Sequence, residues 1–390
     1  MKKVTLIGSF SGRNAGDIAI LANILDDFAE VRSDIQFLIP TLKPSFVRDH
    51  YGHHNVKPMG MMPWHLSLKA LGLATYRSMT NTDMVLITDN ALFDRKLYNP
   101  LVNTMFSVGL MAPLCKKRNI PIVFYNASVG PIDTPKGAEI LQTILDASKL
   151  VTLRDKKTQE IFEELNLKSP EIHLLADAAI NTKPSPDSRL EQIIRDEDLF
   201  PNGDAGTISF NVNAYIDNWS NTGKLTREQF CQIIAASIDK VIDDLDVNVL
   251  LTVTQVMDIT ITNEVKQFIR NQDKIRIITN EKYTCNDIVG ILDKVDTHIG
   301  LRTHSLIFCA AINTPMISIN SYPKNAGFMR SIAQDDWMIE FEDVNVEHIA
   351  GMVSKSWHER EQRKSELIPI TAIEKKKAKQ AVQLVSDLLG

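Results

Sequence analysis

Short apolar runs alternate with longer amphipathic stretches along most of the chain, and this alternation limits the possible folds more than any other feature. The first-half runs are hydrophobic throughout rather than at every second position, which is typical of strands covered on both faces. The pattern predicts β-α-β units around a parallel sheet. The runs are KVTLIG, DIQFLIP, DMVLITD, IPIVFYNAS, LVTLRD and IHLLAD, with stretches such as DIAILANILDDFAEV and TQEIFEELNL between them.

The alternation lapses once and then resumes. The interruption, NTKPSPDSRLEQIIRDEDLFPNGDAG, is rich in proline, glycine and charge, which indicates a linker. A second series follows, and the chain then ends in the charged amphipathic stretch AIEKKKAKQAVQLVSDLL. The second series consists of GTISFNVN, VNVLLTVT, KIRIITN, DTHIGLR and TPMISIN.

A chain of 390 residues is long for a single hydrophobic core. We therefore expect an α/β protein with two Rossmann-like domains that face each other across a cleft, as in type B glycosyltransferases (GT-B). The expected boundaries are an N-terminal domain over 1–183, a linker over 184–205, a C-terminal domain over 206–370 and a C-terminal helix over 371–390.

Charge and cysteine content narrow the class of protein. The formal net charge is −5 and the isoelectric point is about 6.0, so no global basic field points to nucleic acid as a partner. The four cysteines are far apart and form no C-x-x-C pair, which argues against a zinc ribbon or a disulfide framework. Free thiols and the lack of a signal-peptide pattern at MKKVTLIGSF predict a cytoplasmic protein.

Two segments raise the question of membrane contact. The stretch HNVKPMGMMPWHLSLKALGLATYRSM is apolar, but Pro58, Pro63 and three basic residues interrupt it, so it would at most lie on a membrane surface or line a groove. The run IEKKKAKQ reads as a solvated helix face, with contact to anionic lipid headgroups as the alternative. A peripheral position at the inner face of the membrane therefore stays open.

Three basic side chains fall where neighbouring strands should end. In GLRTHSLIFCAAINTPMISINSYPKNAGF, Arg302 and His304 follow one predicted strand and Lys324 follows the next. Open α/β sheets bind ligands beyond the carboxyl ends of their strands. Arginine suits a carboxylate or phosphate as a planar fork, and lysine supplies a compact charge. A lone histidine here would more often be structural, but the three groups together suit a small dianion or trianion.

Two further strand ends carry candidate residues. In LIGSFSGRNAGDIAI the glycines do not match G-x-G-x-x-G, so the dinucleotide fingerprint is absent, and a tight turn with Asp17 at the helix start is the plainer interpretation. In VTLRDKKTQEIF, Asp155 should cap the next helix. Arg154 should end the strand and point into the interdomain cleft, where a surface salt bridge and an anion contact are equally plausible.

Taken together, these segments resemble the polysaccharide pyruvyl transferase family. The resemblance rests on GRNAGDIAI, ASVGPI, TLRDKKTQEIFEEL, LLADAA and LRTHSLIFCAAINTPMISINSYPKNAGFM, whose order and spacing cover most of residues 1–333. The last segment is the most specific. Thr303 departs from the family pattern, which more often has leucine between the arginine and the histidine, and we expect this change to affect packing without removing the charged pair.

The resemblance implies transfer of a pyruvyl group from phosphoenolpyruvate to two sugar hydroxyls, forming a ketal in cell-surface or exopolysaccharide biosynthesis. Phosphoenolpyruvate would be a co-substrate, and no metal or other cofactor is expected. The C-terminal domain would hold the donor. The N-terminal domain would hold the sugar acceptor, and a nucleotide sugar, a lipid-linked intermediate and a finished glycan all stay open as that acceptor.

The same resemblance suggests roles for single residues. Arg302, Lys324 and Arg154 would neutralise the carboxylate and phosphate of the donor. His304 would be the general acid that protonates the donor carbon. The remaining candidates are Asp17 as general base, Asp177 as the second choice for that role, and Asn14 as a hydrogen-bond partner of the acceptor.

Two other functions fit the same sequence. A GT-B glycosyltransferase that uses a nucleotide sugar would share the two-domain architecture and would need similar cations for a diphosphate. A non-catalytic anion-binding module is the third possibility, and the retained Arg302, His304 and Lys324 argue against it.

Overall fold

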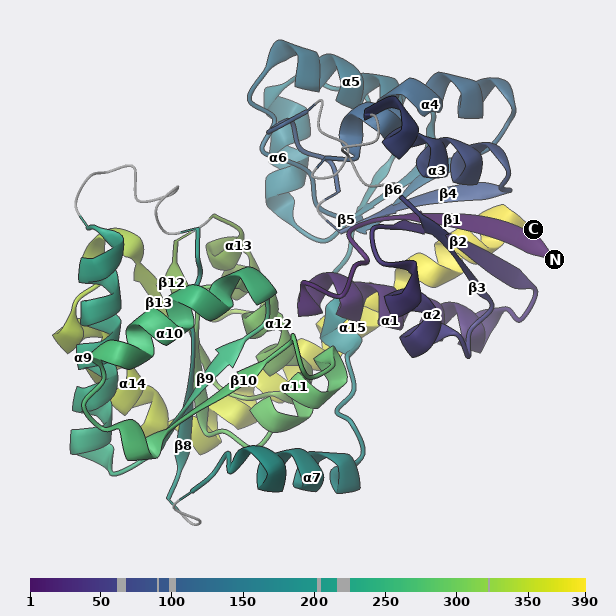
Figure 1. The fold of residues 1–390 in the computed structure, drawn as a ribbon. Helices are drawn as coiled ribbons and strands as arrows, with labels where there is room; N and C mark the ends of the chain where they lie inside the picture. The colour runs from purple at the N-terminus through teal and green to yellow at the C-terminus, as the bar shows by residue number, and fades with distance from the viewer. Residues whose placement is uncertain (62–67, 90, 98–102, 202–204, 216–224, 322) are drawn as a thin grey trace. The chain divides into compact units, whose positions relative to one another are not determined.

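The computed structural model describes residues 1–61, 68–89, 91–97, 103–201, 205–215, 225–321 and 323–390. Over this part of the chain the protein divides into two compact units. Unit 1 comprises Met1–Gly12, Asp17–Ala178 and Lys375–Gly390, and unit 2 comprises Arg13–Gly16 and Ala179–Glu374. Each unit is an α/β body built on one sheet (Figure 1).

Unit 1 is built on a seven-stranded sheet in the order β3-β2-β1-β4-β5-β6-β7. All neighbouring strands are parallel. Strand β1 pairs with β2 on one side and β4 on the other, so the strand order reverses between β1 and β4. The strands are β1 Lys2–Ile7, β2 Ile35–Thr41, β3 Val56–Gly60, β4 Met84–Thr88, β5 Ile122–Ala127, β6 Ser148–Leu153 and β7 Ile172–Leu174.

Local signals in the sequence set the helices of unit 1. Asp155 caps α6, as predicted, because its Oδ1 accepts a hydrogen bond from the Thr158 amide at 2.8 Å. Thr134 caps α5 in the same way, with Pro135 in the first turn, where no amide donor is needed. The helices are α1 Ala15–Val31, α2 Pro44–Tyr51, α3 Leu68–Thr80, α4 Met105–Lys117, α5 Pro135–Leu145 and α6 Lys156–Glu164.

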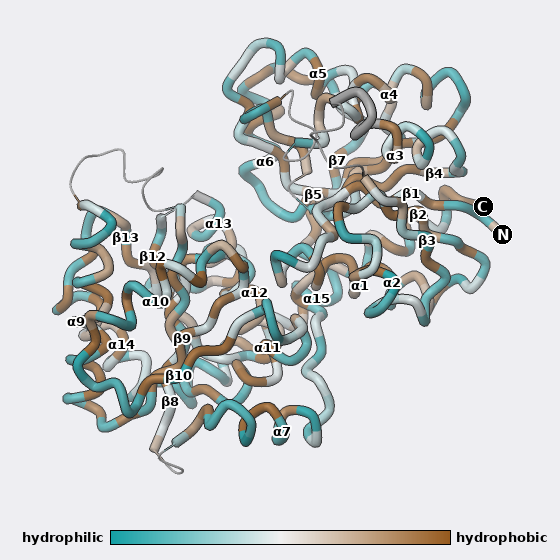
Figure 2. The backbone as a smooth tube through the Cα atoms, viewed as in Figure 1, coloured by the Kyte–Doolittle hydropathy of each residue, from teal (hydrophilic) through white to brown (hydrophobic). Residues whose placement is uncertain are grey.

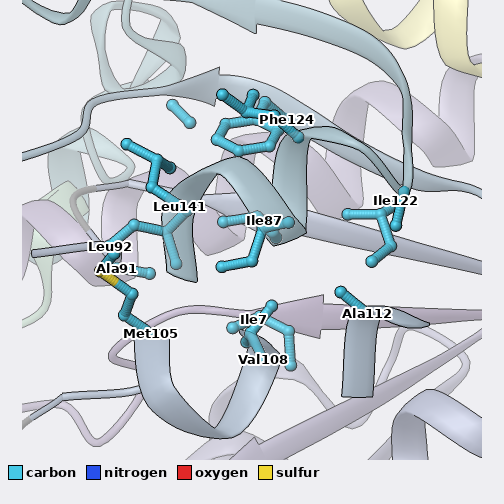
Figure 3. Packing of buried hydrophobic residues seen from close by; sticks show 14 of the residues in the cluster. Ile7, Ile87, Ala91, Leu92, Met105, Val108, Ala112, Ile122, Phe124 and Leu141 are labelled. Carbon is cyan, nitrogen blue, oxygen red and sulfur yellow. The ribbon is translucent and has the colours of Figure 1, made fainter. Parts of the chain in front are cut away.

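The continuous hydrophobicity of the strands is explained by the core of unit 1. Ile87 on β4 and Phe124 on β5 face Val108 on α4 and Leu141 on α5, and all four are fully buried (Figure 3). Burial of each such side chain stabilises the fold by about 1.5–3 kcal/mol. The strands are among the hydrophobic segments of the backbone, while the outer turns are largely polar (Figure 2).

Unit 2 repeats the plan with six parallel strands in the order β10-β9-β8-β11-β12-β13. Here the strand order reverses between β8 and β11. The strands are β8 Thr207–Asn211, β9 Asn248–Val253, β10 Ile275–Thr279, β11 Thr297–Gly300, β12 Met316–Asn320 and β13 Met338–Glu340. The helices are α7 Asp187–Glu197, α9 Arg227–Leu245, α10 Ile259–Phe268, α11 Cys285–Leu292, α12 Thr303–Ile312, α13 Pro323–Ser331, α14 Val346–His358 and α15 Arg360–Leu389.

The prediction of two parallel α/β sheets is confirmed, and each apolar run of the two series quoted above holds all or most of a strand. Two strands were not predicted, β3 and β13, and both lie at sheet edges. Edge strands need only one hydrogen-bonded neighbour, so a short segment, or one with a proline such as Pro58, can form them. Their weak sequence signal follows from that position.

The segments that join and end the domains differ from the prediction. Residues 184–205, expected as a linker, contain α7, which buries Leu190 and Ile193 and belongs to unit 2. Leu190 lies so close to Gly290 of α11 that a β-carbon there would come within 2.6 Å of it. The C-terminal helix begins at Arg360 rather than at 371, and its last residues belong to unit 1.

All four cysteines are buried free thiols. In the described part of the chain, no helix combines the length and the hydrophobicity needed to cross a bilayer.

Candidate functional site

The candidate residues lie near the carboxyl ends of the two sheets, where doubly wound folds bind their ligands. Arg302 and His304 directly follow β11, and Lys324 follows the neighbouring strand β12. Arg154 follows β6, Asp177 follows β7, and Asp17 lies in the first turn of α1. Each unit therefore carries its own cluster, and the two clusters are described in turn.

A buried ion pair fixes Arg302 in unit 2. Its Nε donates to Asp258 Oδ2 at 2.8 Å, and its Nη2 donates to Asp258 Oδ1 at 2.6 Å. Asp258 is fully buried and also accepts from the Ala214 amide at 2.8 Å. The Arg302 amide donates to Asn211 Oδ1 at 3.0 Å, and its guanidinium lies 5.2 Å from the Tyr215 ring centre. Arg302 is thus held in one orientation, and Asp258 offsets its charge.

His304 lies against the backbone of Gly16. A β-carbon at position 16 would come within 2.1 Å of the His304 ring, so no side chain fits there while the ring keeps its place. This close approach explains the third glycine of LIGSFSGRNAGDIAI better than a phosphate-binding turn does.

The segment Arg13–Gly16 reaches this position because its backbone is hydrogen-bonded to unit 2. The Ala15 amide donates to the Thr254 carbonyl at 2.8 Å, and the Val256 amide donates to the Arg13 carbonyl at 3.0 Å. The Asn14 side chain accepts from the Gly16 amide at 2.9 Å. In this structure Asn14 therefore stabilises the turn that brings Gly16 to His304, and a contact to an acceptor stays a prediction.

A hydrogen-bonded asparagine ties the start of α13 to the start of α12. Asn325, next to Lys324, donates to the Leu301 carbonyl at 2.9 Å and accepts from the Thr303 hydroxyl at 2.6 Å. Leucine could not donate this bond, so Thr303 adds a hydrogen bond to the change in packing expected from the sequence. The tie brings the backbones that carry Arg302, His304 and Lys324 to one edge of the unit 2 sheet.

Arg154 lies in unit 1 between two carboxylates. Its Nη1 donates to Asp177 at 2.5 Å, and its Nη2 lies 3.1 Å from Asp89 Oδ1. All three side chains are at most 10% exposed. Burial alone would lower the pKa of the guanidinium, but the carboxylates of Asp177, Asp89, Asp155 and Asp17 together raise it above its ordinary value.

These contacts bear out one of the two interpretations of Arg154 made from the sequence and do not test the other. The residue forms an ion pair, and the pair is buried rather than on the surface. With two direct carboxylate partners, Arg154 adds no net positive charge to its surroundings. Its role as a donor ligand stays a prediction.

Two residues of these clusters were not singled out from the sequence. Asp258 follows β9 through a short turn and resembles an ordinary helix-start residue. Asp89 directly follows β4 with a φ of 53°, an unusual backbone angle that sequence does not reveal. In both cases the sequence showed only an aspartate that follows a predicted strand. Such aspartates are too common to be chosen as site residues without knowledge of their arginine partners.

Comparison with known proteins bears on the whole chain. Amylovoran biosynthesis protein AmsJ of Erwinia amylovora is 23% identical over 369 residues, which is 85% of this chain and 86% of that protein. The UDP-GlcNAc 2-epimerase of Neisseria meningitidis bound to UDP-GlcNAc superposes with a TM-score of 0.68 at 10% identity, covering 100% and 99% of the two chains. Anabaena Alr3699/HepE in complex with UDP-glucose gives a TM-score of 0.64 at 12% identity, with the same coverage. At these identities the two structures show that the fold is shared.

The decisive match is to a family. The sequence model of the polysaccharide pyruvyl transferase family matches residues 14–322, which include Arg154, Arg302 and His304 and end just before Lys324. On this match, which spans most of both units, the chain belongs to the polysaccharide pyruvyl transferase family.

Proposed function

We propose that this protein transfers the pyruvyl group of phosphoenolpyruvate to two hydroxyls of a sugar, forming a cyclic ketal during exopolysaccharide synthesis. The observation that carries the proposal is the family match over 14–322, together with the placement of Arg302 and His304 at the strand-order reversal of unit 2. The family match, together with the likeness to the amylovoran biosynthesis protein AmsJ, supports a polysaccharide acceptor.

We assign the donor to unit 2, because its basic groups converge on one sheet edge. Phosphoenolpyruvate carries a carboxylate and a phosphate, and a planar guanidinium suits either group. Two nitrogens of Arg302 are used by Asp258, so Nη1 is the atom we assign to the donor. Since Asp258 offsets much of the Arg302 charge, Lys324 would supply the larger share of the attraction.

His304 would act on the reacting carbon. In the proposed first step its imidazolium gives a proton to C3 of the enol, which makes C2 electrophilic. A sugar hydroxyl then bonds to C2 and loses its proton to a carboxylate. The C2–O bond to phosphate breaks, a second hydroxyl bonds to C2, and its proton leaves with the phosphate. One proton thus ends on C3, one on the carboxylate and one on phosphate, and passage of the carboxyl proton back to the His304 imidazole through solvent restores both groups.

The carboxylate would come from unit 1, where we assign the sugar acceptor. Asp17 keeps the first place as general base, and Asp177 keeps the second. Arg154 holds Asp177 at 2.5 Å and contacts Asp89 from the same guanidinium. A contribution of Arg154 through the orientation of these carboxylates fits its contacts better than direct neutralisation of the donor.

The test is an incubation of the purified protein with phosphoenolpyruvate and candidate glycans, with phosphate release and acceptor mass as readouts. We expect phosphate release only with an acceptor, and an acceptor that gains one pyruvate less one water. A parallel incubation replaces phosphoenolpyruvate with UDP-sugars. Turnover with a UDP-sugar and none with phosphoenolpyruvate would reject the proposal.

Two variants separate donor binding from proton transfer. Lys324→Ala should weaken donor binding about 10- to 150-fold, because a charge-assisted hydrogen bond contributes about 1.5–3 kcal/mol. His304→Gln should lower turnover about 10²- to 10⁴-fold with a smaller effect on binding. Calorimetric titration with phosphoenolpyruvate gives the affinities. If His304→Gln turns over normally at saturating donor, His304 is a binding residue and the acid lies elsewhere.

A further inference from the structure

Helices α3 and α4 of unit 1 form an exposed surface that the proposed reaction does not use. They pack side by side (Figure 1). Both connect parallel strands of one sheet, so they run in the same direction. Their C-terminal ends meet, because Arg118 Nη1 donates to the Thr80 carbonyl at 3.4 Å.

Large apolar side chains project from both helices. Leu73 is 42% exposed and Tyr76 41% on α3, and Leu110 is 57% exposed on α4. Leu73 lies seven residues before Thr80, and Leu110 lies eight before Arg118. At about 1.5 Å per residue both leucines lie about 10–12 Å from the joined helix ends, so they lie at similar positions along the axes of the two helices.

Basic side chains occupy the ends of the same two helices. Arg77 of α3 is exposed, and so are Lys116, Lys117 and Arg118 at the end of α4. Positive charge at a helix C-terminus also offsets the helix dipole, which would account for some of these residues. These four residues and the three apolar ones together make up what we call the α3–α4 surface.

The sequence around this surface lacks acidic residues. No aspartate or glutamate occurs between Asp49 and Asp83, or between Asp94 and Asp133, and these intervals contain all of α3 and α4. The chain as a whole has 48 acidic and 43 basic residues, so such a segregation does not follow from composition. The helix dipole explains the basic ends of the helices but not the missing acids.

We propose that the α3–α4 surface docks on a membrane that carries anionic lipids. Exposed leucine and tyrosine side chains can enter the interfacial layer, while lysine and arginine contact the headgroups. A second copy of this chain is a poorer partner, because a two-fold contact would place the four basic residues of one surface against those of the other. This inference does not depend on the proposed reaction.

The test is sedimentation of the full-length protein with phosphatidylcholine vesicles, prepared with and without phosphatidylglycerol. We expect binding only to the anionic vesicles, and weaker binding as salt rises. Lys116→Ala/Lys117→Ala should weaken it about 25-fold, since each basic side chain near an anionic surface contributes about five-fold. Leu110→Ser should weaken it about ten-fold or more through lost apolar burial.

The matched control is Lys376→Ala/Lys377→Ala, which removes two charges from the basic run of α15. It should bind as the unmodified protein does, and the α4 variants should keep the unmodified thermal unfolding midpoint because Leu110 and the two lysines of α4 are exposed. Absence of binding to anionic vesicles at low salt overturns the proposal. So does a loss of binding confined to the α15 variant. If the α4 substitutions change only the oligomeric state in sedimentation velocity, the surface is a contact between copies instead.

Discussion

At the scale of single residues, both arginines expected to bind the donor already contact aspartates. Arg302 is paired with Asp258, and Arg154 is paired with Asp89 and Asp177. A buried ion pair adds little net stability, because desolvation offsets most of the attraction. Such pairs do fix the orientation of the guanidinium group, since the two charged groups have few other ways to pair. We therefore interpret the aspartates as positioning residues for the guanidinium groups.

Asp258→Asn tests this interpretation. The carboxamide keeps the shape but sets an amide N–H against the Arg302 guanidinium, so we expect donor affinity to fall at least about ten-fold. If Asp258 only neutralised charge, its loss would instead tighten the binding of an anion. Calorimetric titration with phosphoenolpyruvate shows whether the affinity falls or rises.

The control for this experiment is Asp239→Asn. Asp239 is also buried in unit 2 and also pairs with an arginine, Arg270, but that partner is largely exposed. Removal of one partner of a buried pair destabilises a protein by about 3–5 kcal/mol, so Asp258→Asn should also lower thermal stability. Only Asp258→Asn should change the affinity. An equal loss of affinity in both variants would mean that general destabilisation is responsible.

Gly16→Ala tests the contact with His304. The new β-carbon would lie 2.1 Å from the imidazole, so the ring must move. If His304 is the proton donor, turnover should fall about 10²- to 10⁴-fold, as for His304→Gln. Stability should also fall, because the new β-carbon would lie 2.6 Å from the His304 β-carbon, and we expect the resulting strain to outweigh the gain of about 1 kcal/mol by which alanine favours a helix over glycine. Phosphate release and thermal unfolding measure the two effects.

The double variant Gly16→Ala/His304→Gln completes the cycle. Because both changes would act through the same imidazole, the double variant should be no slower than His304→Gln alone. If the double variant is slowed by the product of the two single losses in turnover, Gly16 acts independently of His304. The contact between them would then have no functional meaning.

At the scale of secondary-structure elements, the end of α15 is an integral part of unit 1. Ala378, Ala381 and Val385 are fully buried, and the Asn126 side chain donates to the Ala378 carbonyl at 3.0 Å. Lys379 lies 3.5 Å from Asp27 of α1. The C-terminal helix predicted over 371–390 thus contributes to the core beside α1 and β5.

This contact gives unit 1 a pH dependence. Burial raises the pKa of Asp27 to about 6 from an ordinary 3.8, although Lys379 acts in the opposite direction. The folded protein therefore holds this proton more tightly than the unfolded chain. The stability from Asp27 is fully present below about pH 4 and is lost as the pH rises towards about 6.

Asp27→Asn should remove that dependence. At about pH 8 the variant should be more stable than the unmodified protein by up to about 3 kcal/mol, and near pH 4 the two should be similar. Thermal unfolding followed by circular dichroism at both pH values measures the difference. The exposed Asp49→Asn on α2 serves as the control and should shift neither midpoint. A variant that is less stable at high pH would show that the attraction to Lys379 outweighs the burial of Asp27.

At the scale of the whole molecule, the sequence by itself determined the fold class and most strands. Continuous apolar runs fit only strands covered on both faces, and their alternation with helices permits few topologies. It also placed Arg302, His304 and Lys324 at strand ends, because parallel strands bring their carboxyl ends to one edge. The family followed from the same segments, and the match over residues 14–322 confirms it.

Tertiary structure decided the features that depend on partners distant in sequence. The segment Arg13–Gly16 is grouped with unit 2 because the Thr254 carbonyl and the Val256 amide hold it there, more than 200 residues along the chain. The last residues of α15 are likewise grouped with unit 1. The aspartate partners of Arg302 and Arg154 also depend on the fold. The charge of a side chain can be read from its residue type, but the residue that pairs with it lies elsewhere in the sequence. Sequence could name the basic residues, but only the fold could show which of them are already neutralised.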